Sequence, residues 1–530
     1  MIKRIIGKII ASTAGKNKKL GRAVEIPASE HHINRHLLEP KAVEVVRTLK
    51  NAGFDAYIVG GAVRDLVLGV RPKDFDVATN ATPEQVKALF RRAFIIGRRF
   101  RIVHVVFGRG RDHEVIEVST FRALLDNAQA EKVSGNEKTA KTALAGIKHA
   151  VDEHGRVLRD NVWGSLQEDA ARRDFTINAM YYDPERHIIV DYHGGFADCQ
   201  RHIIQLIGEP ATRYREDPVR ILRAVRFAAK LEGLGFAIEK KTAAPIASCK
   251  ELLLDIPQSR MFDETLKLLQ TGHAEASLRQ LQKTGLVGAK KGIYPLLDLI
   301  AERADAPLVQ AALRDTDRRI QEGKSAAAYF LLACVLWEEV EERWQALLDA
   351  GEHTIPALSA AIDEIFDRRI GDVSGRGKLA ADMREVWMMQ PRFERRTPSG
   401  SPRLLENFRF RAAYDFYRLR AAVGQADMGI ADWWEEFSTA PDDDARADLL
   451  AQVPKERAAN SKKRGAKKQS KSIDNAVDAA WVAPETAANT GDPAAAPAAK
   501  KRRRKPKKAS NAKPEQADSQ AESQAEATPE

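Results

Sequence analysis

The chain has few cysteines and no long apolar run, and each shortage excludes a class of protein. Its three cysteines, Cys199, Cys249 and Cys334, lie far apart and lack the spacing of a zinc site. They suit a reducing cytoplasm and argue against a disulfide framework. No stretch of about 18 apolar residues occurs that could span a membrane. We therefore expect a cytoplasmic protein, and 530 residues predict several domains rather than a single core.

The charge of the chain is unevenly distributed. The formal net charge is +11, and residues 455–530 hold seventeen Lys and Arg residues against ten Asp and Glu residues. Their background of Ala, Pro, Asn and Gln cannot bury enough apolar surface to fold, which predicts a disordered basic tail. Clustered cations attract polyanions, above all nucleic acid; the alternative is a tail that only improves solubility. Residues 1–24 are basic and make a poor secretory signal, so we expect a flexible N-terminal extension.

A glycine pair marks the most informative segment. The sequence AYIVGGAVRDLVLG predicts a short apolar strand, a tight turn at Gly60 and Gly61, and a helix that Gly69 ends. Glycines lack Cβ atoms, so their backbone N–H groups can approach a polyphosphate closely. The helix N-terminus adds its dipole, and Arg64 adds a positively charged fork. This pattern is typical of a turn that binds phosphate groups.

Two aspartates, Asp74 and Asp76, follow this helix in the sequence KDFDVAT. In an extended strand residues i and i+2 point the same way, so both carboxylates share one face while Phe75 and Val77 pack on the other. Two carboxylates beside a phosphate-binding turn are what Mg²⁺-dependent phosphoryl or nucleotidyl transfer needs. Either motif alone is usually structural, but their closeness in one strand–turn–helix–strand unit favours a catalytic site.

The surrounding pattern predicts an α/β head over residues 25–200. Residues 25–50 look helical, and the sequence ATPEQVKALFRR predicts a helix with Thr82 as its N-cap. Residues 102–108 and 114–121 read as neighbouring strands joined by a polar turn. Small strands with interspersed helices are typical of such a head.

The remaining chain divides by composition. Residues 122–159 are polar with little apolar period, which predicts a flexible loop inserted in the head. From about residue 200 to 440 the pattern is nearly all helical. We expect a helical nucleotide-binding neck over residues 201–270 and a helical RNA-binding body over residues 271–454, before the tail.

The segment EDAARRDFTINAMYYD joins Arg172, Arg173 and Asp174 to the apolar start of a predicted helix. An Arg–Asp pair at this position can be a plain salt bridge. Beside a nucleotidyl-transfer head, Arg173 could instead reach a triphosphate or ribose, and Asp174 could support the metal site. Glu117 competes with Asp174 as third carboxylate, because strand alternation places it opposite the apolar face of its strand.

Three arginines recur in the segment RYREDPVRILRAVRFAAK. Arg220, Arg223 and Arg226 share one helical face, and they repel one another unless an anion or acids lie opposite. Ile221, Leu222, Val225 and Phe227 point largely elsewhere, towards a core. Glu216 and Asp217 stand at the start of the helix, where they suit its dipole and could read a base edge. The alternative is a solvated basic stripe.

Residues 390–420 interleave arginines with aromatic residues. The arginines are Arg392, Arg395, Arg396, Arg403, Arg409 and Arg411, and the aromatic residues near them are Phe393, Phe408, Phe410 and Tyr414. This mixture suits single-stranded RNA, because arginine pairs with phosphate while bases stack on rings. A helical domain with aromatic residues in its core and arginines on its surface is an equal alternative.

Taken in order, the motifs GGAVRD, DFDVATNATPE, RRDFTINAM and EDPVRILRAVRF resemble the bacterial poly(A) polymerase and tRNA CCA-adding nucleotidyltransferase superfamily. This match runs from about residue 25 to about 240. The segments IIGRRFRIVHVVFG and QPRF…FRFRAAYDF, together with the basic tail, are more similar to the poly(A) polymerase branch, and they extend the resemblance to about residue 420. The chain departs from both branches in the length of its 122–159 loop.

The resemblance implies a role for each matching residue. Asp74 and Asp76 match the metal-binding catalytic pair, and Asp174 is the motif-based third catalytic carboxylate. Asp217 and Arg220 match the pair that reads the incoming base, and Arg223 and Arg226 match residues that support the triphosphate. The other nucleotide-binding residues that the resemblance implies are Gly60, Gly61, Arg64 and Arg173.

The resemblance also implies a fold and an activity. The fold is an α/β nucleotidyltransferase head with a small mixed sheet, followed by an all-helical body and the disordered tail. The activity is transfer of AMP from ATP to RNA 3′ ends without a template, with Mg²⁺ as cofactor. Single-stranded RNA 3′ ends, ATP, and RNA-degradation or RNA-chaperone proteins are the expected partners. The alternatives are a CCA-adding enzyme and a non-catalytic RNA-binding protein.

Overall fold

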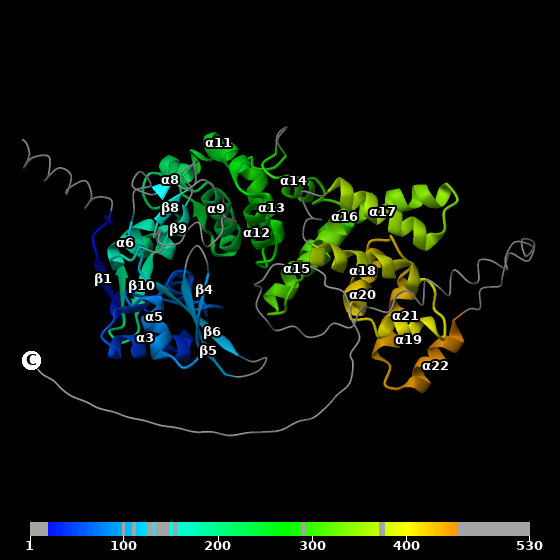
Figure 1. Ribbon diagram of the computed structural model, residues 1–530, viewed down its shortest axis with the longest axis horizontal. Helices are drawn as coiled ribbons and strands as arrows, with labels where there is room; N and C mark the ends of the chain where they lie inside the picture. Colours follow the sequence, from blue (N-terminus) through cyan, green and yellow to red (C-terminus); the bar gives the residue numbers. More distant parts are fainter. Residues whose placement is uncertain are drawn as a thin grey trace, which may run out of the picture. The chain divides into compact units, whose positions relative to one another are not determined.

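The computed structural model describes residues 20–97, 101–108, 113–124, 162–288, 292–369 and 377–453, and the backbone alone of three short strands between residues 131 and 160. The predicted N-terminal extension up to residue 19 and the predicted tail lie outside the described residues. Figure 1 shows a sheet near the start of the chain, followed by helices that continue to residue 452. The predicted order of an α/β head before a helical body is confirmed.

The head is built on an eight-stranded mixed sheet with the strand order β1-β11-β10-β2-β3-β6-β5-β4. The strands are β1 (Val24–Pro27), β2 (Ala56–Val59), β3 (Asp76–Thr79), β4 (Ala93–Ile96), β5 (Ile102–Phe107), β6 (Glu114–Thr120), β10 (Met180–Asp183) and β11 (Ile188–Asp191). Only the β3–β6 pair is parallel, and the other six neighbouring pairs are antiparallel. The β5–β6 hairpin predicted from alternation is confirmed.

The two faces of the sheet are covered differently. Helices α3 (Pro40–Asn51), α4 (Gly61–Val67) and α5 (Pro83–Leu89) pack on one face, where Val77 of β3 joins the main core. Helix α6 (Leu166–Arg172) contributes to a smaller cluster on the opposite face, which includes Ala78. Because side chains alternate along a strand, Asp76 shares the face of Ala78. The catalytic candidates therefore lie on the face that α3, α4 and α5 leave open.

The start of α5 follows its sequence closely. Thr82 accepts a hydrogen bond from the backbone of Gln85, and the Gln85 side chain accepts one from Thr82 N, which completes a capping box. Pro83 occupies the first turn, where a missing N–H costs nothing. These local contacts confirm the predicted helix start.

Three predictions of local structure need correction. Residues 25–50 are not one helix: β1 comes first, followed by short turns α2 (Ala28–His31) and η1 (Arg35–Leu37), and α3 begins only at Pro40. Pro27 has no backbone N–H to donate, which suits the edge position of β1 beside β11. The predicted helix after Asp174 is instead a 3₁₀ turn, η4 (Thr176–Asn178), and strand β10, where the β-forming Tyr181 and Tyr182 are both buried.

The predicted loop at 122–159 also contains regular structure. Strands β7 (Glu131–Lys132), β8 (His149–Val151) and β9 (Val157–Asp160) form a separate three-stranded sheet in the order β7-β8-β9. The rest of this segment, from residue 125 to 161, lies outside the described residues. The segment predicted as an inserted flexible loop therefore includes three short strands.

A helical region follows the head. Its helices are α7 (Gly195–Gln200), α8 (Pro210–Glu216), α9 (Val219–Lys230), α10 (Lys240–Ala243), α11 (Ile246–Cys249), α12 (Gln258–Leu269), α13 (Ala274–Lys283), α14 (Pro295–Glu302), α15 (Pro307–Gln321), α16 (Ala328–Asp349), α17 (Thr354–Arg368), α18 (Gly377–Phe393), α19 (Gly400–Leu405), α20 (Phe410–Ala422), α21 (Met428–Thr439) and α22 (Asp443–Gln452). Two 3₁₀ turns, η5 (Glu232–Leu234) and η6 (Lys250–Asp255), and the parallel strands β12 (Ile203–Ile204) and β13 (Ala237–Ile238) interrupt this helical pattern.

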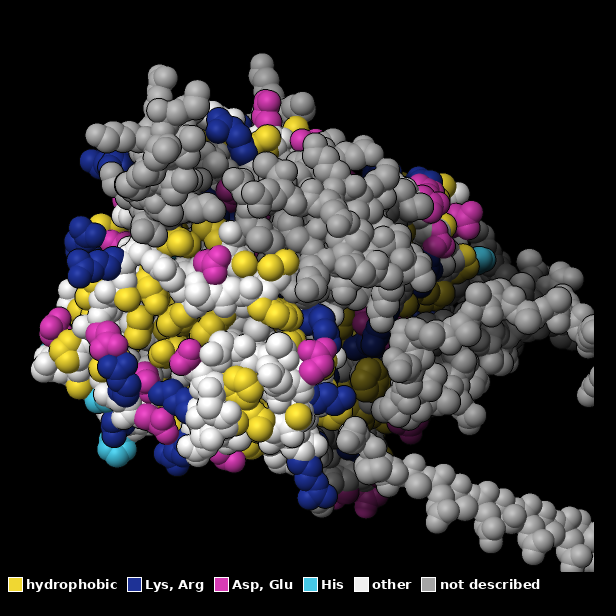
Figure 2. All heavy atoms as spheres, turned by 60° about the vertical axis from the view of Figure 1, so that its left-hand side comes forward, with side chains coloured by type: hydrophobic (Ala, Val, Ile, Leu, Met, Phe, Trp, Pro, Cys, Tyr) yellow, Lys and Arg dark blue, Asp and Glu magenta, His cyan; other side chains and the backbone are white. Residues whose placement is uncertain are grey.

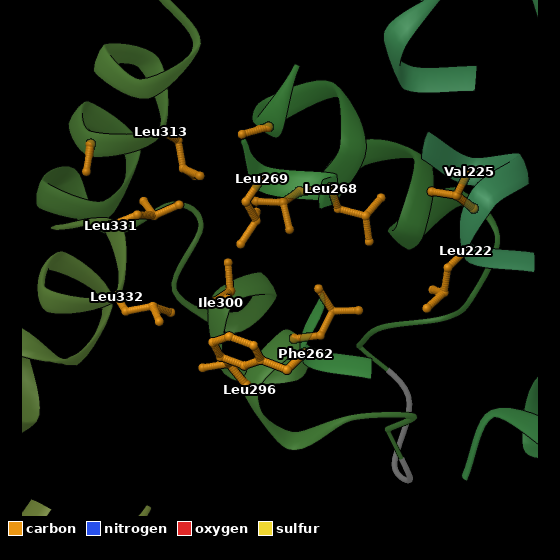
Figure 3. Close-up of a cluster of buried hydrophobic side chains, with 14 of the residues drawn as sticks. Leu222, Val225, Phe262, Leu268, Leu269, Leu296, Ile300, Leu313, Leu331 and Leu332 are labelled. Carbon is orange, nitrogen blue, oxygen red and sulfur yellow. The ribbon is translucent and has the colours of Figure 1, made fainter. Parts of the chain in front are cut away.

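The buried side chains of these helices form one continuous cluster. Figure 3 shows Leu222 of α9, Phe262 and Leu269 of α12, Ile300 of α14 and Leu332 of α16 pointing into a shared interior. Each is at most 3% exposed, so burial of this apolar surface stabilises the helices far more than helix propensity does. No helix among the described residues combines the length and apolar character that crossing a bilayer requires.

Candidate active site

The glycine turn between β2 and α4 adopts a conformation that depends on its residue type. Gly60 has φ +73° and ψ −135°, which side-chain-bearing residues rarely adopt, and it is the N-cap of α4. A Cβ atom on Gly60 would lie 3.6 Å from Arg173 Nη1, and one on Gly61 would lie 3.3 Å from Arg64 Nη2. The turn is therefore flanked by two guanidinium groups.

Arg64 lies behind this turn instead of projecting from it. The residue is 1% exposed, and it donates from Nε (2.9 Å) and Nη2 (2.7 Å) to Asp65 Oδ1. Its Nη1 donates to Asn178 Oδ1 at 2.7 Å. The expected phosphate-binding fork is not open to a ligand in this conformation, because Asp65 and Asn178 already use it. Arg64 supports the turn from below.

The two predicted aspartates are presented as the alternation indicated. Asp74 and Asp76 are exposed, whereas Phe75 and Val77 are 6% and 0% exposed. Asp76 is the first residue of β3, so its carboxylate stands at the strand edge next to the glycine turn, where Val59 of β2 is its cross-strand partner. Two acidic side chains therefore face the same open surface of the sheet.

The structure separates the two candidates for a third carboxylate. Glu117 of β6 is in register with Asp76 across the parallel β3–β6 pair, where neighbouring strands lie about 4.8 Å apart. Asp174 is instead partly buried beside α9, and Arg223 donates to its Oδ2 from Nε (2.7 Å) and Nη2 (2.5 Å). That guanidinium outweighs burial and holds the pKa of Asp174 below its ordinary value. Glu117 belongs to the aspartate pair, and Asp174 belongs to the arginine row.

The aspartate pair lies among like charges. Loss of surrounding water, together with the negative charges of Glu117 and Asp74, raises the pKa of Asp76 to about 6, while the charge of Arg173 acts against this rise. No set of three His, Cys, Asp or Glu side chains is gathered closely enough among the described residues to hold a metal unaided. Mg²⁺ is commonly held by one or two carboxylates plus substrate phosphates, and this arrangement fits that pattern.

Arg173 is fixed beside the glycine turn by its own set of partners. It donates from Nε (3.3 Å) and Nη2 (3.1 Å) to Asp169 Oδ2, from Nε to Tyr181 Oη (3.0 Å), and from Nη1 to the backbone oxygen of Asn178 (3.3 Å). Burial acts against the charged form of Asp169, but Arg173 and Arg172 lower the pKa of that carboxyl to about 2. Asn178 contacts both Arg64 and Arg173, so one residue links the two guanidinium groups that flank the turn.

The arginine row of α9, which we define as Arg220, Arg223 and Arg226, lies on one face as predicted. Glu216 accepts from Arg220 at 3.1 Å, and Glu264 accepts from Arg226 at 3.3 Å, while Asp174 pairs with Arg223. The side chains of Arg220, Arg223 and Arg226 are 14%, 32% and 12% exposed. The alternative of a fully solvated basic stripe is therefore excluded. Acids lie opposite the arginines, as like charges on one face require.

Two further residues of this region differ from expectation or extend it. Arg260 donates to Asp217 Oδ2 at 2.8 Å, so the proposed base-reading carboxylate is already held in place. Phe227 packs against the core beside Phe175, as expected, and its partly buried ring also lies 5.4–5.7 Å from the guanidinium carbons of Arg64, Arg223 and Arg226. An aromatic face can stabilise cations at such distances, so Phe227 holds the three arginines together.

Sequence reasoning missed two residues of the site. His104 of β5 is the cross-strand partner of Glu117, and its Nε2 lies 3.2 Å from Glu117 Oε1. Lys230 ends α9; loss of water and the charge of Arg64 lower its pKa, while Asp65 and Asp74 raise it. Lys230 follows Arg226 by four residues, so the helical spacing of the row could have revealed it.

The aromatic residues of the 390–420 segment mostly belong to the core. Phe393, Phe410 and Tyr414 are 0%, 6% and 1% exposed and pack around Trp434 or one another. For these three the core interpretation is correct. Phe408 is the exception, at 89% exposed.

The surface of the molecule carries side chains of mixed character. Figure 2 shows hydrophobic side chains gathered on the face that it presents, with Lys, Arg, Asp and Glu side chains around them. The described part of this face therefore carries side chains of both charges.

Three segments of the chain match models of known protein families. Residues 56–205 match a family model described as the poly A polymerase head domain, residues 235–289 match the probable RNA and SrmB-binding site of polymerase A, and residues 350–471 match the polymerase A arginine-rich C-terminus. The chain is 39% identical over 448 residues to the poly(A) polymerase I of Salmonella typhi, which covers 83% of this chain and 91% of the relative. A CCA-adding enzyme of Bacillus licheniformis is 30% identical over 75% of this chain and 98% of the relative.

A solved structure is also similar. The crystal structure of the Bacillus stearothermophilus CCA-adding enzyme in complex with CTP is 27% identical and aligns with 79% of this chain and 84% of that chain, with a TM-score of 0.47. The mixed-sheet head with its aspartate pair, together with the family models, defines a nucleotidyltransferase. Within that class, the chain belongs to the poly(A) polymerase I family.

Proposed function

We propose that this protein adds AMP from ATP to RNA 3′ ends without a template and releases pyrophosphate. The observation that carries the proposal is the closeness of three groups: the glycine turn, the carboxylates of Asp76 and Glu117, and the positively charged Arg173. Relatives named poly(A) polymerase I support AMP transfer, since they match more of this chain at higher identity than the CCA-adding enzymes do.

Asp74 and Asp76 are the residues that would hold Mg²⁺. Repulsion from Glu117 and Asp74 adds to the loss of water that raises the pKa of Asp76, and a bound cation would relieve that repulsion. When bound, Mg²⁺ lowers the pKa of an attacking RNA 3′-hydroxyl and neutralises charge on the leaving pyrophosphate. We assign Glu117, rather than Asp174, as the third carboxylate of the site, because it is the one in register with Asp76.

The nucleotide would be positioned by the chain's own groups. Backbone N–H groups at Gly60 and Gly61 would contact phosphate oxygens, and Arg173 stands beside them with its orientation fixed by Asp169 and Tyr181. In-line attack on the α-phosphate depends mainly on such positioning and on charge stabilisation. Arg64 acts in this scheme as a positioning residue for the turn.

The arginine row and Asp217 would bind the rest of the nucleotide. Asp217 and Arg220 would read the base edge through hydrogen bonds, and Arg223 and Arg226 would bind the triphosphate. Each of these arginines already has an acid partner, so nucleotide binding requires exchange of a carboxylate for a phosphate. Such an exchange keeps the arginines oriented before the nucleotide arrives.

The RNA partner is proposed from the family and from the charge of the chain. Two of the matching family models are described as a probable RNA and SrmB-binding site and as an arginine-rich C-terminus. The seventeen Lys and Arg residues of the tail would raise the local concentration of RNA near the site. Proteins of RNA degradation and RNA chaperones are further proposed partners, and cytoplasm is the proposed location.

The test is incubation of the purified chain with a labelled, unstructured RNA, Mg²⁺ and each of the four NTPs separately. We expect a long ladder with ATP, and no ladder from the Asp74→Ala/Asp76→Ala double variant, which should still bind the RNA. The matched control is Glu44→Ala, which removes an exposed acid of α3 away from the site. CTP and ATP addition to a tRNA that lacks its end, without an ATP ladder, would support the CCA-adding alternative. RNA binding without any incorporation would support the non-catalytic one.

A further inference from the structure

Phe408 is the most exposed large hydrophobic residue that the described part of the chain contains. It is 89% exposed, and the next values are 56% for Val24 and 55% for Phe94. Exposure of an aromatic side chain forgoes roughly 2 kcal/mol of burial free energy, so folding alone gives no reason for it. The neighbouring Phe410, by contrast, is 6% exposed and packs against Trp434.

The turn that carries Phe408 is fixed by local hydrogen bonds. It joins α19 to α20, and Asn407 Oδ1 accepts from the backbone N–H of Arg409 at 2.7 Å. The backbone N–H of Asn407 donates to Leu404 O (3.2 Å), and that of Phe410 donates to Asn407 O (2.9 Å). With the buried Phe410 as an anchor on its C-terminal side, this turn presents the Phe408 ring outward in a defined place.

A held cation lies against the ring. The guanidinium carbon of Arg409 is 4.9 Å from the centroid of Phe408 and 4.8 Å from that of Tyr329. Arg409 donates to Asp382 Oδ1 at 2.6 Å and to Tyr329 Oη at 3.1 Å, so its position does not depend on Phe408. Since Phe408 remains 89% exposed, most of its surface is open to a ligand. A ring stacked on a cation can also stack on a second planar group.

The charge of the surrounding segment favours a polyanion. Residues 391–411 contain six arginines against two glutamates. Arg409 and Arg411 pair with Asp382 and Asp415, respectively. Arg403 is exposed, and no carboxylate lies within 4.0 Å of it among the described residues. Glu406, also exposed, is the acidic residue nearest to Phe408 in the sequence.

We propose that Phe408 is a stacking platform for a base of single-stranded RNA, with Arg403 as a nearby contact for phosphate. Every base has a π face, so a stacked ring binds RNA without reading its sequence, as template-independent addition requires. A protein partner would need a contiguous apolar patch, whereas a single ring among arginines matches RNA chemistry. The proposal rests on the proposed function for the biological origin of the RNA, but its test measures binding alone.

The experiment measures the affinity of the full chain for labelled oligo(A) of about 15 nucleotides, by fluorescence anisotropy without ATP. The Asp74→Ala/Asp76→Ala background removes turnover, so loss of catalysis cannot affect the result. Phe408→Ala should weaken binding about 5- to 100-fold, while Phe408→Trp should retain it. Phe408→Leu should behave like Phe408→Ala, because leucine keeps apolar surface but offers no ring. Met428→Ala is the matched control: this exposed apolar residue begins α21, and its loss should leave affinity unchanged.

Two further readouts separate stacking from other effects. A probe with the same phosphate backbone but no bases should bind wild type and Phe408→Ala equally, since it has nothing to stack. The slope of log Kd against log salt should stay unchanged in Phe408→Ala and become shallower in Arg403→Gln, because only the second change removes a charge. Unaltered oligo(A) affinity in Phe408→Ala would overturn the proposal.

Discussion

The acids of the head and the arginines of α9 differ in whether side chains of opposite charge lie beside them. No Lys or Arg nitrogen lies within 4.0 Å of Asp74, Asp76 or Glu117 among the described residues. The arginine row, by contrast, has a carboxylate for each member, namely Glu216, Asp174 and Glu264. The first group gathers acids with no Lys or Arg in contact, although His104 lies 3.2 Å from Glu117, and the second group balances its charge internally.

This difference indicates how each group meets its ligand. Neighbouring carboxylates repel one another, and this repulsion adds to the loss of water that raises the pKa of Asp76. A divalent cation would relieve the repulsion directly. Arginines that are paired with carboxylates do not repel one another in this way, but a phosphate that binds them must displace or share those carboxylates. We therefore expect the metal affinity of the head to depend strongly on pH. We expect the arginine row to bind nucleotide reversibly and with modest affinity.

The largest effect should separate Glu117 from Asp174. Glu117→Gln removes a carboxylate charge beside Asp76, and we expect kcat to fall roughly 100-fold with KM for ATP changed little. Asp174→Asn leaves Arg223 without its charged partner, so it should mainly change KM for ATP and lower the melting temperature. Steady-state kinetics of AMP incorporation, with thermal melts of both variants, provide the measurement.

The matched control for that pair is Glu114→Gln, which neutralises an exposed acid at the start of the same strand as Glu117. It should leave kcat and KM near wild-type values. A larger fall in kcat for Asp174→Asn than for Glu117→Gln would show that Asp174, and not Glu117, is the third catalytic carboxylate. It would also contradict the division between the acids of the head and the arginine row.

Local pattern explains why much of the fold could be predicted. Alternation places Asp76 opposite Val77, and helical spacing puts Arg220, Arg223 and Arg226 on one face; both depend only on neighbours in the chain. The capping box at Thr82 is local as well. The folded structure keeps these local features because no contact with a distant segment competes with them.

What could not be predicted depends on contacts between distant segments. Arg64 turns away from the phosphate side because Asn178, 114 residues later, accepts its hydrogen bond. Asp174 leaves the aspartate pair because Arg223, 49 residues later, binds it. The proximity of Glu117 to Asp76 follows from the parallel β3–β6 register, which no local pattern determines.

A second prediction concerns pH. Protonated Asp76 is a poor metal ligand, so the affinity for Mn²⁺ as a probe should fall as pH drops through about 6, by roughly tenfold between pH 7 and pH 5. The sign follows from a raised pKa: the proton competes with the metal over a range where an ordinary aspartate is already ionised. Calorimetric titration of the nucleotide-free chain measures it.

Glu117→Gln sharpens the same test. Because the negative charge of Glu117 helps to raise the pKa of Asp76, its removal should move the midpoint of Asp76 titration to lower pH. Carboxylate NMR of the metal-free variant reports this midpoint without any need for activity. A midpoint that stays near 6 in the variant would show that loss of water alone sets the pKa.

The smallest expected effect lies where the two groups meet. Lys230 ends the helix of the arginine row, yet the charge of Asp74 acts on it, so this amine belongs electrostatically to both groups. Lys230→Gln should raise KM for ATP by about 3- to 10-fold, because a cation near the triphosphate is lost. The same change should strengthen Mn²⁺ binding by about 2- to 5-fold, because a competing positive charge near Asp74 is removed.

Opposite signs make this prediction sharper than its size suggests. A general loss of structure would weaken the binding of both ligands, whereas removal of one charge between an acidic and a basic group must favour the cation and disfavour the anion. Lys240→Gln, which neutralises an exposed lysine on α10, is the control and should change neither constant. If Lys230→Gln weakened Mn²⁺ and ATP binding together, Lys230 would support the fold of the site, and the boundary between the two groups would have to be placed elsewhere.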